Sequence, residues 1–186
     1  MKISSIVLGA GVAISLIGCA HHDSHKSSSD AEPGKPAKTM KAVAELAPSS
    51  NSKVRGTVTF TRRGDTTQVE AVLTGLTPGL HGFHIHEKGD CSAPDASSAG
   101  GHFNPNTVEH GGPDSIHRHA GDFGNVEADP VGHVFFSKKF PHLEFDGPAS
   151  ILGRAVIIHA HADDLTTQPS GNAGGRVACG VIQQIK

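Results

Sequence analysis

The residues in this chain that are best suited to chemistry are its histidines. The sequence has 14 of them, nearly as many as its 16 Lys and Arg together, and 11 lie between positions 81 and 161. His84 and His86 form the first close pair, in the stretch GFHIH. Alternate side chains of a strand share a face, so both imidazoles can reach one ion while Phe83 and Ile85 face a core. Histidine is the commonest metal ligand, and the composition therefore favours a metal site, although this pair alone is a weak signal.

Five further candidate ligands follow downstream. They are His102 in GGHFNP, His110 in EHGGP, His119 and Asp122 in RHAGD, and His159 in IIHAHADDL. Seven ligands exceed what one tetrahedral ion needs, and they suit two ions, especially if one ligand is shared. Imidazoles suit copper and zinc, and a single carboxylate among them fits zinc. The alternative is a set of loop histidines that bond to backbone and water.

The sequence does not fully define the ligand set, because other histidines lie close to two of these candidates. His117 lies two residues before His119, and either could be the ligand. His161 lies two residues after His159, and we interpret it as a residue at the rim of the site. Of the others, His133 and His142 are interpreted as surface residues, and His21, His22 and His25 belong either to a solvated tail or to a weak metal-capture site.

The elements that must position these ligands have the period of strands. Short apolar or alternating runs lie at 54–60, 68–73, 83–86, 131–136, 151–158 and 177–182. Such runs, bounded by many of the 23 Gly and 11 Pro, favour an antiparallel sandwich or barrel and exclude a helical bundle. TRRGD at 61–65 and LTPGL at 76–80 are typical of hairpin turns. The Gly-rich segments 87–121 and 160–176 are expected to be long loops, which often carry function.

The composition also limits the partners of the chain. The formal net charge is −2, which does not suit a general nucleic-acid binder. The chain has no Trp and no Tyr, so stacking on bases would depend on 8 Phe and on His. We therefore expect no nucleic-acid partner.

The first 50 residues are expected to lie outside the fold. Lys2 precedes an apolar run, 3–18, which is shorter than the roughly 20 residues of a spanning helix and fits a signal peptide over 1–18. The run ends in LIGC at Cys19, which resembles a bacterial lipobox whose cysteine is lipidated; the alternative is an ordinary signal peptide with an incidental cysteine. Residues 19–50 are then expected to be a lipidated cysteine and flexible tether, and 51–186 the folded domain.

Lipidation of Cys19 has consequences for location and for the other cysteines. It predicts an exported, lipid-anchored protein of a bacterial cell envelope, facing the periplasm and touching the membrane only through its N-terminal lipid. Ala20 after the cysteine favours the outer membrane, if the host has one. Cys91 and Cys179 then remain as a pair in an oxidising compartment.

Six stretches, in this order and spacing, resemble the copper/zinc superoxide dismutases: GFHIHEKGDC, GGHFNPN, HGGPDS, RHAGDFGNVEAD, IIHAHADDL and GNAGGRVACGVI. The resemblance covers residues 53–183, nearly the whole expected domain. It implies an all-β fold, an immunoglobulin-like Greek-key β-sandwich or barrel of about eight antiparallel strands with two long functional loops. It also implies an enzyme that dismutes superoxide to O₂ and H₂O₂ through alternating reduction and oxidation of a His-bound copper, as an antioxidant defence in the cell envelope.

The same resemblance implies one copper and one zinc in each subunit and assigns roles to individual residues. Arg176 would present its guanidinium over the copper and attract superoxide, and His102, which bridges both metals, would take up a proton when copper is reduced. The copper ligands would be His84, His86, His102 and His159, and the zinc ligands His102, His110, His119 and Asp122. The remaining roles are a carboxylate that joins a copper-ligand His to a zinc-ligand His (Asp163), a disulfide (Cys91 and Cys179) and a buried structural histidine (His81).

The chain departs from the family pattern at the rim of the expected site. The segment after IIHAHADDL is shorter than the electrostatic loop of animal and plant members, with Pro169 where Lys is common and Ser170 where Thr is usual. Fewer cations predict weaker steering of an anion and a different salt dependence. A homodimer is compatible with the sequence, but no interface is indicated.

Two other functions compete with dismutation. A copper-storing module would be expected to lack the bridging histidine or the arginine, whereas His102 and Arg176 are both present. A zinc hydrolase would need an open coordination position and a general base, whereas Asp122 is interpreted as a ligand and Asp163 as its support.

Overall fold

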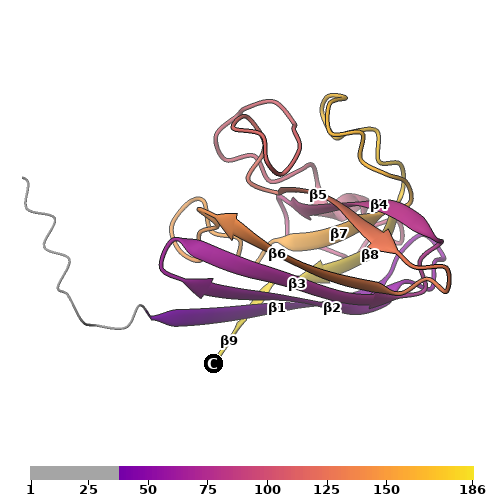
Figure 1. Ribbon diagram of the computed structural model, residues 1–186, viewed down its shortest axis with the longest axis horizontal. Coiled ribbons are helices and arrows are strands. Elements are labelled where there is room, and N and C mark those ends of the chain that lie inside the picture. Colours follow the sequence, from indigo (N-terminus) through magenta and orange to yellow (C-terminus); the bar gives the residue numbers. More distant parts are fainter. Residues whose placement is uncertain (1–37) are drawn as a thin grey trace, which may run out of the picture. The chain divides into compact units, whose positions relative to one another are not determined.

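The computed structural model describes residues 38–186, and this part of the chain is built almost entirely of strands (Figure 1). The elements are β1 (Thr39–Pro48), β2 (Arg55–Arg63), β3 (Thr66–Thr74), β4 (Gly79–His86), the 3₁₀ turn η1 (Ser97–Ala99), β5 (Asp122–Ala128), β6 (Val134–Pro141), β7 (Ala155–His159), β8 (Arg176–Val181) and β9 (Gln183–Ile185). The expected all-β class is therefore confirmed. Among the described residues no helix has the length and apolar character needed to cross a membrane.

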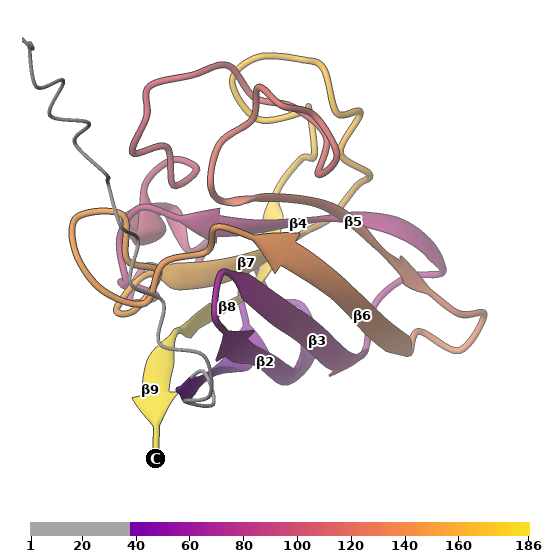
Figure 2. The same ribbon diagram turned by 60° about the vertical axis from the view of Figure 1, so that its left-hand side comes forward.

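The strands form one continuous antiparallel path that folds back on itself as a sandwich. The pairing order is β5-β4-β7-β8-β1-β2-β3-β6, and β9 pairs with β1. Strand β1 joins the two halves, because Thr39–Leu46 pair with β2 while Ala47 and Pro48 pair with β8. The chain crosses between the halves from β3 to β4, from β5 to β6 and from β6 to β7, as in a Greek key (Figure 2).

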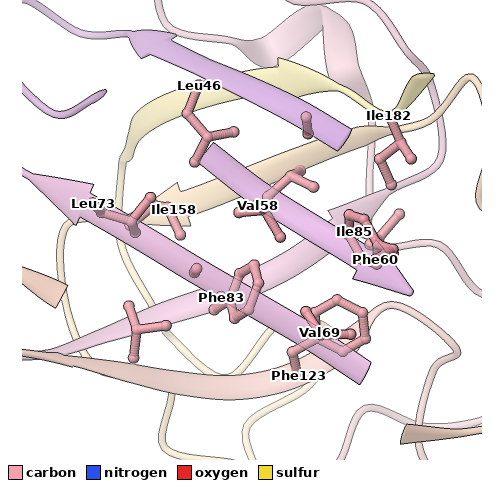
Figure 3. Close-up of a cluster of buried hydrophobic side chains, with 14 of the residues drawn as sticks. Leu46, Val58, Phe60, Val69, Leu73, Phe83, Ile85, Phe123, Ile158 and Ile182 are labelled. Atoms are coloured by element: carbon pink, nitrogen blue, oxygen red, sulfur yellow. The ribbon is translucent and has the colours of Figure 1, made fainter. Parts of the chain in front are cut away.

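The core lies between the two halves and follows the period of two in each strand. Phe60 on β2, Phe83 on β4 and Phe123 on β5 are almost completely buried (Figure 3). The ring centroid of Phe123 lies 5.0 Å from that of Phe83 and 6.4 Å from that of Phe60. Since Phe83 and Ile85 occupy this core, the alternate residues His84 and His86 must point to the opposite face of β4. They are buried as well, because the long loops cover that face.

The expected tether over 19–50 does not hold for its last part, because Thr39–Pro48 form β1. Ala42, Ala44 and Leu46 alternate inward and are buried, whereas Lys41 and Glu45 point to solvent. Small alanines next to Lys and Glu have weak strand propensity, and here pairing with β2 on one side overrides it. The expected signal peptide over 1–18, Cys19 and residues 20–37 lie outside the described residues.

Two other local expectations also need correction. The turn at 61–65 joins β2 to β3 as a hairpin, but LTPGL at 76–80 does not form one, since β3 pairs with β6 and β4 pairs with β5 and β7. Strand β5 was not expected, because GNVEA has one large apolar residue and its Asn125 faces the loops rather than solvent. Both errors concern long-range pairing, which no local pattern reports.

The loops that cover β4 are fixed to the sandwich at several points. A disulfide joins Cys91, in the segment after β4, to Cys179 on β8, with a Cα–Cα distance of 5.8 Å. Phe103 forms two backbone hydrogen bonds beside β4, accepting from Gly121 and donating to Ile85. The residue before it, His102, is thereby held next to His86, with which it forms an isolated bridge.

Replacing Thr67 by Val is expected to raise the free energy of unfolding by about 1 kcal/mol, because a buried hydroxyl without a partner costs free energy that a methyl group does not. Thr67 is fully buried opposite Phe140, and its Oγ1 has no hydrogen-bond partner among the described residues. Urea denaturation measures the change. The control is Thr67→Ser, which keeps the hydroxyl and loses the methyl, and which should be less stable than the parent; a Val variant that is also less stable contradicts the argument.

Candidate metal centre

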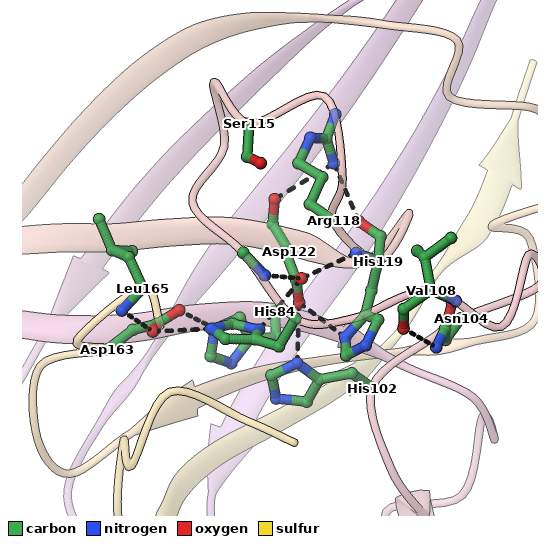
Figure 4. A network of polar contacts seen from close by, with 12 residues as sticks. His84, His102, Asn104, Val108, Ser115, Arg118, His119, Asp122, Asp163 and Leu165 are labelled. Carbon is green, nitrogen blue, oxygen red and sulfur yellow. Dashed lines mark hydrogen bonds and ion pairs between the residues drawn. The ribbon is translucent and has the colours of Figure 1, made fainter. Parts of the chain in front are cut away.

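The chemistry-bearing side chains come together on the outer face of β4 and β7, under the two long loops. His84 and His86 lie on β4 and His159 ends β7, and the two strands are paired. Asp122 begins β5, on the other side of β4, and His119 precedes it in the loop. Figure 4 shows Asp122 among the rings of His84, His102 and His119. All these side chains are buried.

The side chains form two groups of four that share one member. In each group one potential ligand atom of every residue lies within 4.8 Å of the others. His102 belongs to both groups, while His117 and His161 belong to neither and are exposed. The first group is His84, His86, His102 and His159, and the second is His102, His110, His119 and Asp122.

Hydrogen bonds on the outer ring nitrogens turn lone pairs toward the centre of the first group. His86 Nδ1–H donates to the carbonyl oxygen of Gly100 at 2.9 Å, and His159 Nδ1–H donates to that of Gly174 at 3.1 Å. Each neutral ring then carries its lone pair on Nε2. These two Nε2 atoms lie 3.4 Å apart. Two lone pairs that face each other in a buried place repel, and a cation between them removes the repulsion.

One carboxylate sets the orientation of a ring in each group. Asp163 accepts from His84 Nε2–H at 2.8 Å and from His110 Nε2–H at 3.0 Å. Both rings therefore direct Nδ1 inward, a means by which outer carboxylates fix metal-binding histidines. His84 Nδ1, His110 Nδ1 and His102 Nε2 are buried and have no hydrogen-bond partner among the described residues. Unpaired buried nitrogens of this kind fit ligands of a bound ion.

The second group is arranged around Asp122. Its Oδ1 lies 2.8 Å from His102 Nδ1 and 3.2 Å from His119 Nδ1, and its Oδ2 lies 3.0 Å from His110 Nδ1. Oδ2 also accepts from the backbone N–H of Gly111 and of His119. Three imidazoles and one carboxylate that converge at these distances are a suitable donor set for zinc.

The comparison with known protein families agrees with this donor set. The family described as copper/zinc superoxide dismutase (SODC) matches residues 54–182. The chain belongs to this family. It is thus an oxidoreductase that dismutes superoxide, and copper and zinc are its metals.

The electrostatics of the dismutase differ between the two groups. Burial lowers the pKa of His84 to about 4, of His159 to about 3 and of His86 to about 2, so these rings are neutral at neutral pH. Burial also acts against the charged form of His110, but Asp122 and Asp163 together raise its pKa to about 9. His84, His86 and His159 thus offer neutral lone pairs in the first group. In the second group, the carboxylates around His110 favour positive charge.

Arg176 lies beside the first group at the wall of an open hollow of about 430 Å³. Its Nη1 donates to the carbonyl oxygen of Ala96 and its Nη2 to that of Gly100, each at 2.6 Å. Arg176 is the one Lys or Arg among the described residues that line this hollow, and Pro169 and Ser170 stand at its rim. Pro169 and Ser170, which depart from the family pattern, therefore line this hollow, where Arg176 is the one cation among the described residues.

Several supporting residues were missed in the sequence. Asn125 pairs with the backbone of Asp163, donating to its carbonyl at 2.9 Å and accepting from its N–H at 2.7 Å. Gln168 likewise donates to the carbonyl oxygen of His110 at 2.9 Å and accepts from its backbone N–H at 2.8 Å. Arg154 donates to the carbonyl oxygen of Glu87, and its guanidinium carbon lies 3.6 Å from the ring centroid of Phe103, the residue after His102. No spacing signal could have indicated these contacts.

Replacing Gly171 by Ala is expected to weaken zinc binding by the dismutase by about tenfold or more, because outer-shell supports typically contribute that much to metal affinity. A Cβ at Gly171 would overlap the carboxylate of Asp163 and lie 2.7 Å from His110 Nε2. Competition with a chromophoric chelator measures the zinc affinity. The matched control is Gly147→Ala, since Gly147 has nearly the same φ (+68° against +66°) and nothing within 4 Å of a Cβ. Equal zinc affinities of the two variants would contradict the prediction.

Proposed function

We propose that the two groups divide the metals as follows. His84, His86, His102 and His159 hold copper; His102, His110, His119 and Asp122 hold zinc, so that His102 joins the two ions. The observation that supports this proposal is the sharing of His102 between one group of four imidazoles and one group that contains a carboxylate. Carboxylate favours zinc over copper among these ions, and an all-imidazole set suits copper.

Copper, when bound, supplies one-electron redox chemistry, and zinc, which has none, supplies a fixed charge and a rigid loop. The residues of the chain do the rest. Arg176 attracts and orients the superoxide anion in the hollow next to His86 and His159, because its guanidinium is always charged and is held by two carbonyl oxygens. When its Nε2 does not bind copper, His102 can hold a proton on this buried nitrogen, which has no hydrogen-bond partner among the described residues, while Asp122 keeps its Nδ1 side in place.

The test is superoxide dismutation by the purified chain 20–186, as metal-free, zinc-only and copper-plus-zinc forms, beside His102→Ala and Arg176→Ala. We expect activity only with copper. Arg176→Ala should lower it by about tenfold to a hundredfold, and His102→Ala should lower it at least as far. The exposed neighbour of a ligand, His117, provides the control, and His117→Ala should retain activity. A folded, copper-loaded and inactive protein would instead support copper storage.

We also propose that the enzyme acts as an antioxidant defence in a bacterial cell envelope, anchored through lipid on Cys19 after removal of residues 1–18. The apolar run 3–18 and the sequence LIGC support this proposal. The mass of the N-terminal peptide of the mature protein tests it directly. Diacylglycerol on Cys19 is the expected result, and a soluble mature protein that begins after position 19 would refute it.

A further inference from the structure

A second hollow, larger than the one at the metal centre, lies on the opposite half of the sandwich. Its volume is about 610 Å³, and it is open to solvent on the outer face of β1, β2, β3 and β6. The metal centre contributes none of its lining, which consists of Lys41, Thr61, Arg63, Thr66, Gln68, Glu70 and Lys139. We call it the basic groove.

The strand register places the polar side chains of the basic groove in rows. Lys41 is opposite Thr61, Thr61 is opposite Gln68, and Gln68 is opposite Lys139. These residues point outward, since each has a neighbour along its strand that is buried in the core, namely Ala42, Phe60, Val69 and Phe140. Paired strands are about 4.8 Å apart, so the row carries a cation at each end of a span of roughly 14 Å. Arg63 adds a third cation beside the row, opposite Thr66.

The cations of the basic groove are not neutralised. Lys41, Arg63 and Lys139 are exposed, and none of them forms an ion pair with a described residue. Glu70 is the one carboxylate in the lining, and the neighbouring Glu144 is already paired with Arg62. An adjoining hollow shares Lys41 and adds two more cations, Lys38 and Lys186. This end is thus positive, although the whole chain has a net charge of −2.

The lining of the basic groove narrows the class of ligand. It contains no aromatic ring on which a nucleobase could stack. It also lacks the buried apolar centre that a specific protein interface uses. What remains is recognition by charge and hydrogen bonds over a broad area, which suits a layer of anionic headgroups.

The position of the basic groove along the chain points to the same ligand. Lys38 immediately precedes β1, so the segment that leads back to Cys19 joins the domain at this end. The 18 residues between Cys19 and Lys38 can span up to about 60 Å, so an anchor alone would leave the orientation of the domain free. We propose that the basic groove binds the anionic lipid surface of the membrane and fixes which face of the enzyme meets it. This inference rests on the proposed anchorage.

Binding through the basic groove would direct the metal centre away from the lipid. The two long loops that enclose the metal ligands stand on the side of β4 and β5, whereas β1 and β2 lie on the opposite side in both views (Figures 1 and 2). The hollow beside Arg176 would then open toward the aqueous phase rather than toward the lipid. An anionic surface near that hollow would repel the substrate, so this orientation also keeps like charges apart.

The experiment measures co-sedimentation of unlipidated 20–186 with vesicles of phosphatidylcholine, with and without phosphatidylglycerol. The chain 20–186 includes every strand and core residue that the structure describes. The groove variant is Lys41→Gln with Arg63→Gln and Lys139→Gln. The matched control removes three exposed cations elsewhere, by Lys53→Gln, Arg55→Gln and Lys88→Gln. Dismutase activity in solution verifies that both are folded.

We expect the parent to bind only vesicles that contain phosphatidylglycerol, with binding that falls as salt is added. The groove variant should bind about tenfold more weakly or worse, and the control should retain most of the affinity. Equal losses in both variants, or no preference of the parent for anionic vesicles, would overturn the proposal. Preferential binding of purified peptidoglycan over the vesicles would overturn it too. Since the protein carries no lipid in this assay, the result is independent of whether Cys19 is lipidated.

Discussion

An Asp122→Asn variant is expected to lose at least about a hundredfold in zinc affinity and about 3 kcal/mol in the stability of the metal-free protein. Burial opposes the charged form of this carboxylate, yet the close rings of His102 and His110 hold its pKa far below the usual range. The group is therefore a buried anion that three imidazoles and two backbone N–H groups surround. An amide cannot accept from all of them, and its NH₂ would face donors.

Zinc affinity is measured by chelator competition and stability by urea denaturation of the metal-free protein. Asp129→Asn is the matched control, since Asp129 follows β5 but is exposed; its side chain accepts from backbone N–H groups of its own turn, and the ring of His133 lies 3.9 Å away. It should change stability by less than about 0.5 kcal/mol and leave zinc affinity intact. An Asp122 variant that binds zinc as well as this control would show that the ion is held elsewhere.

Removing the disulfide, with Cys91→Ala and Cys179→Ala together, should lower the free energy of unfolding by up to about 4–5 kcal/mol. The cysteines are 88 residues apart in sequence, and a cross-link over so long a loop restricts the unfolded chain strongly. Activity should fall as well, because the segment that carries Ala96 and Gly100, the two acceptors of Arg176, would lose its link to β8.

Urea denaturation under oxidising and reducing conditions tests this prediction. The parent under reduction should approach the stability of the double variant, whereas the variant should be insensitive to the reductant. A loss of less than about 1 kcal/mol in both cases would mean that packing alone fixes the segment.

The members of the two groups could be predicted from sequence, because each stands in a short motif with the residue types that metal coordination needs. His119 rather than His117 joins the second group, because the turn into β5 brings His119 to Asp122. The backbone nitrogen of His119 donates to Asp122 Oδ2 at 2.9 Å. The supports could not be predicted. Asn125 and Asp163 are 38 residues apart, and Gln168 and His110 are 58 apart, so their pairing depends on how two loops fold over β5.

The fold class was predictable from the sequence, but not every strand was. Runs with large alternating residues, such as those around Phe60 and Phe83, mark strands directly. Strand β1 was hidden because Ala42 and Ala44 contribute little hydrophobicity, although both are completely buried. The basic groove was hidden for another reason: only the register of four strands places Lys41 and Lys139 in one row on the same face.

The carbonyl oxygen of Gly100 accepts from both His86 and Arg176, and this sharing affects how the site responds to motion. If the ring and the guanidinium were held by separate loops, thermal displacements of the two would add, and the gap between them would fluctuate. Here a shift of Gly100 carries both groups in the same direction, so most of the displacement is common to them and cancels in their separation. The spacing between Arg176, which we propose attracts the substrate, and the ring of His86 is thus referenced to one atom, and it can stay constant even when the loop that bears that atom moves.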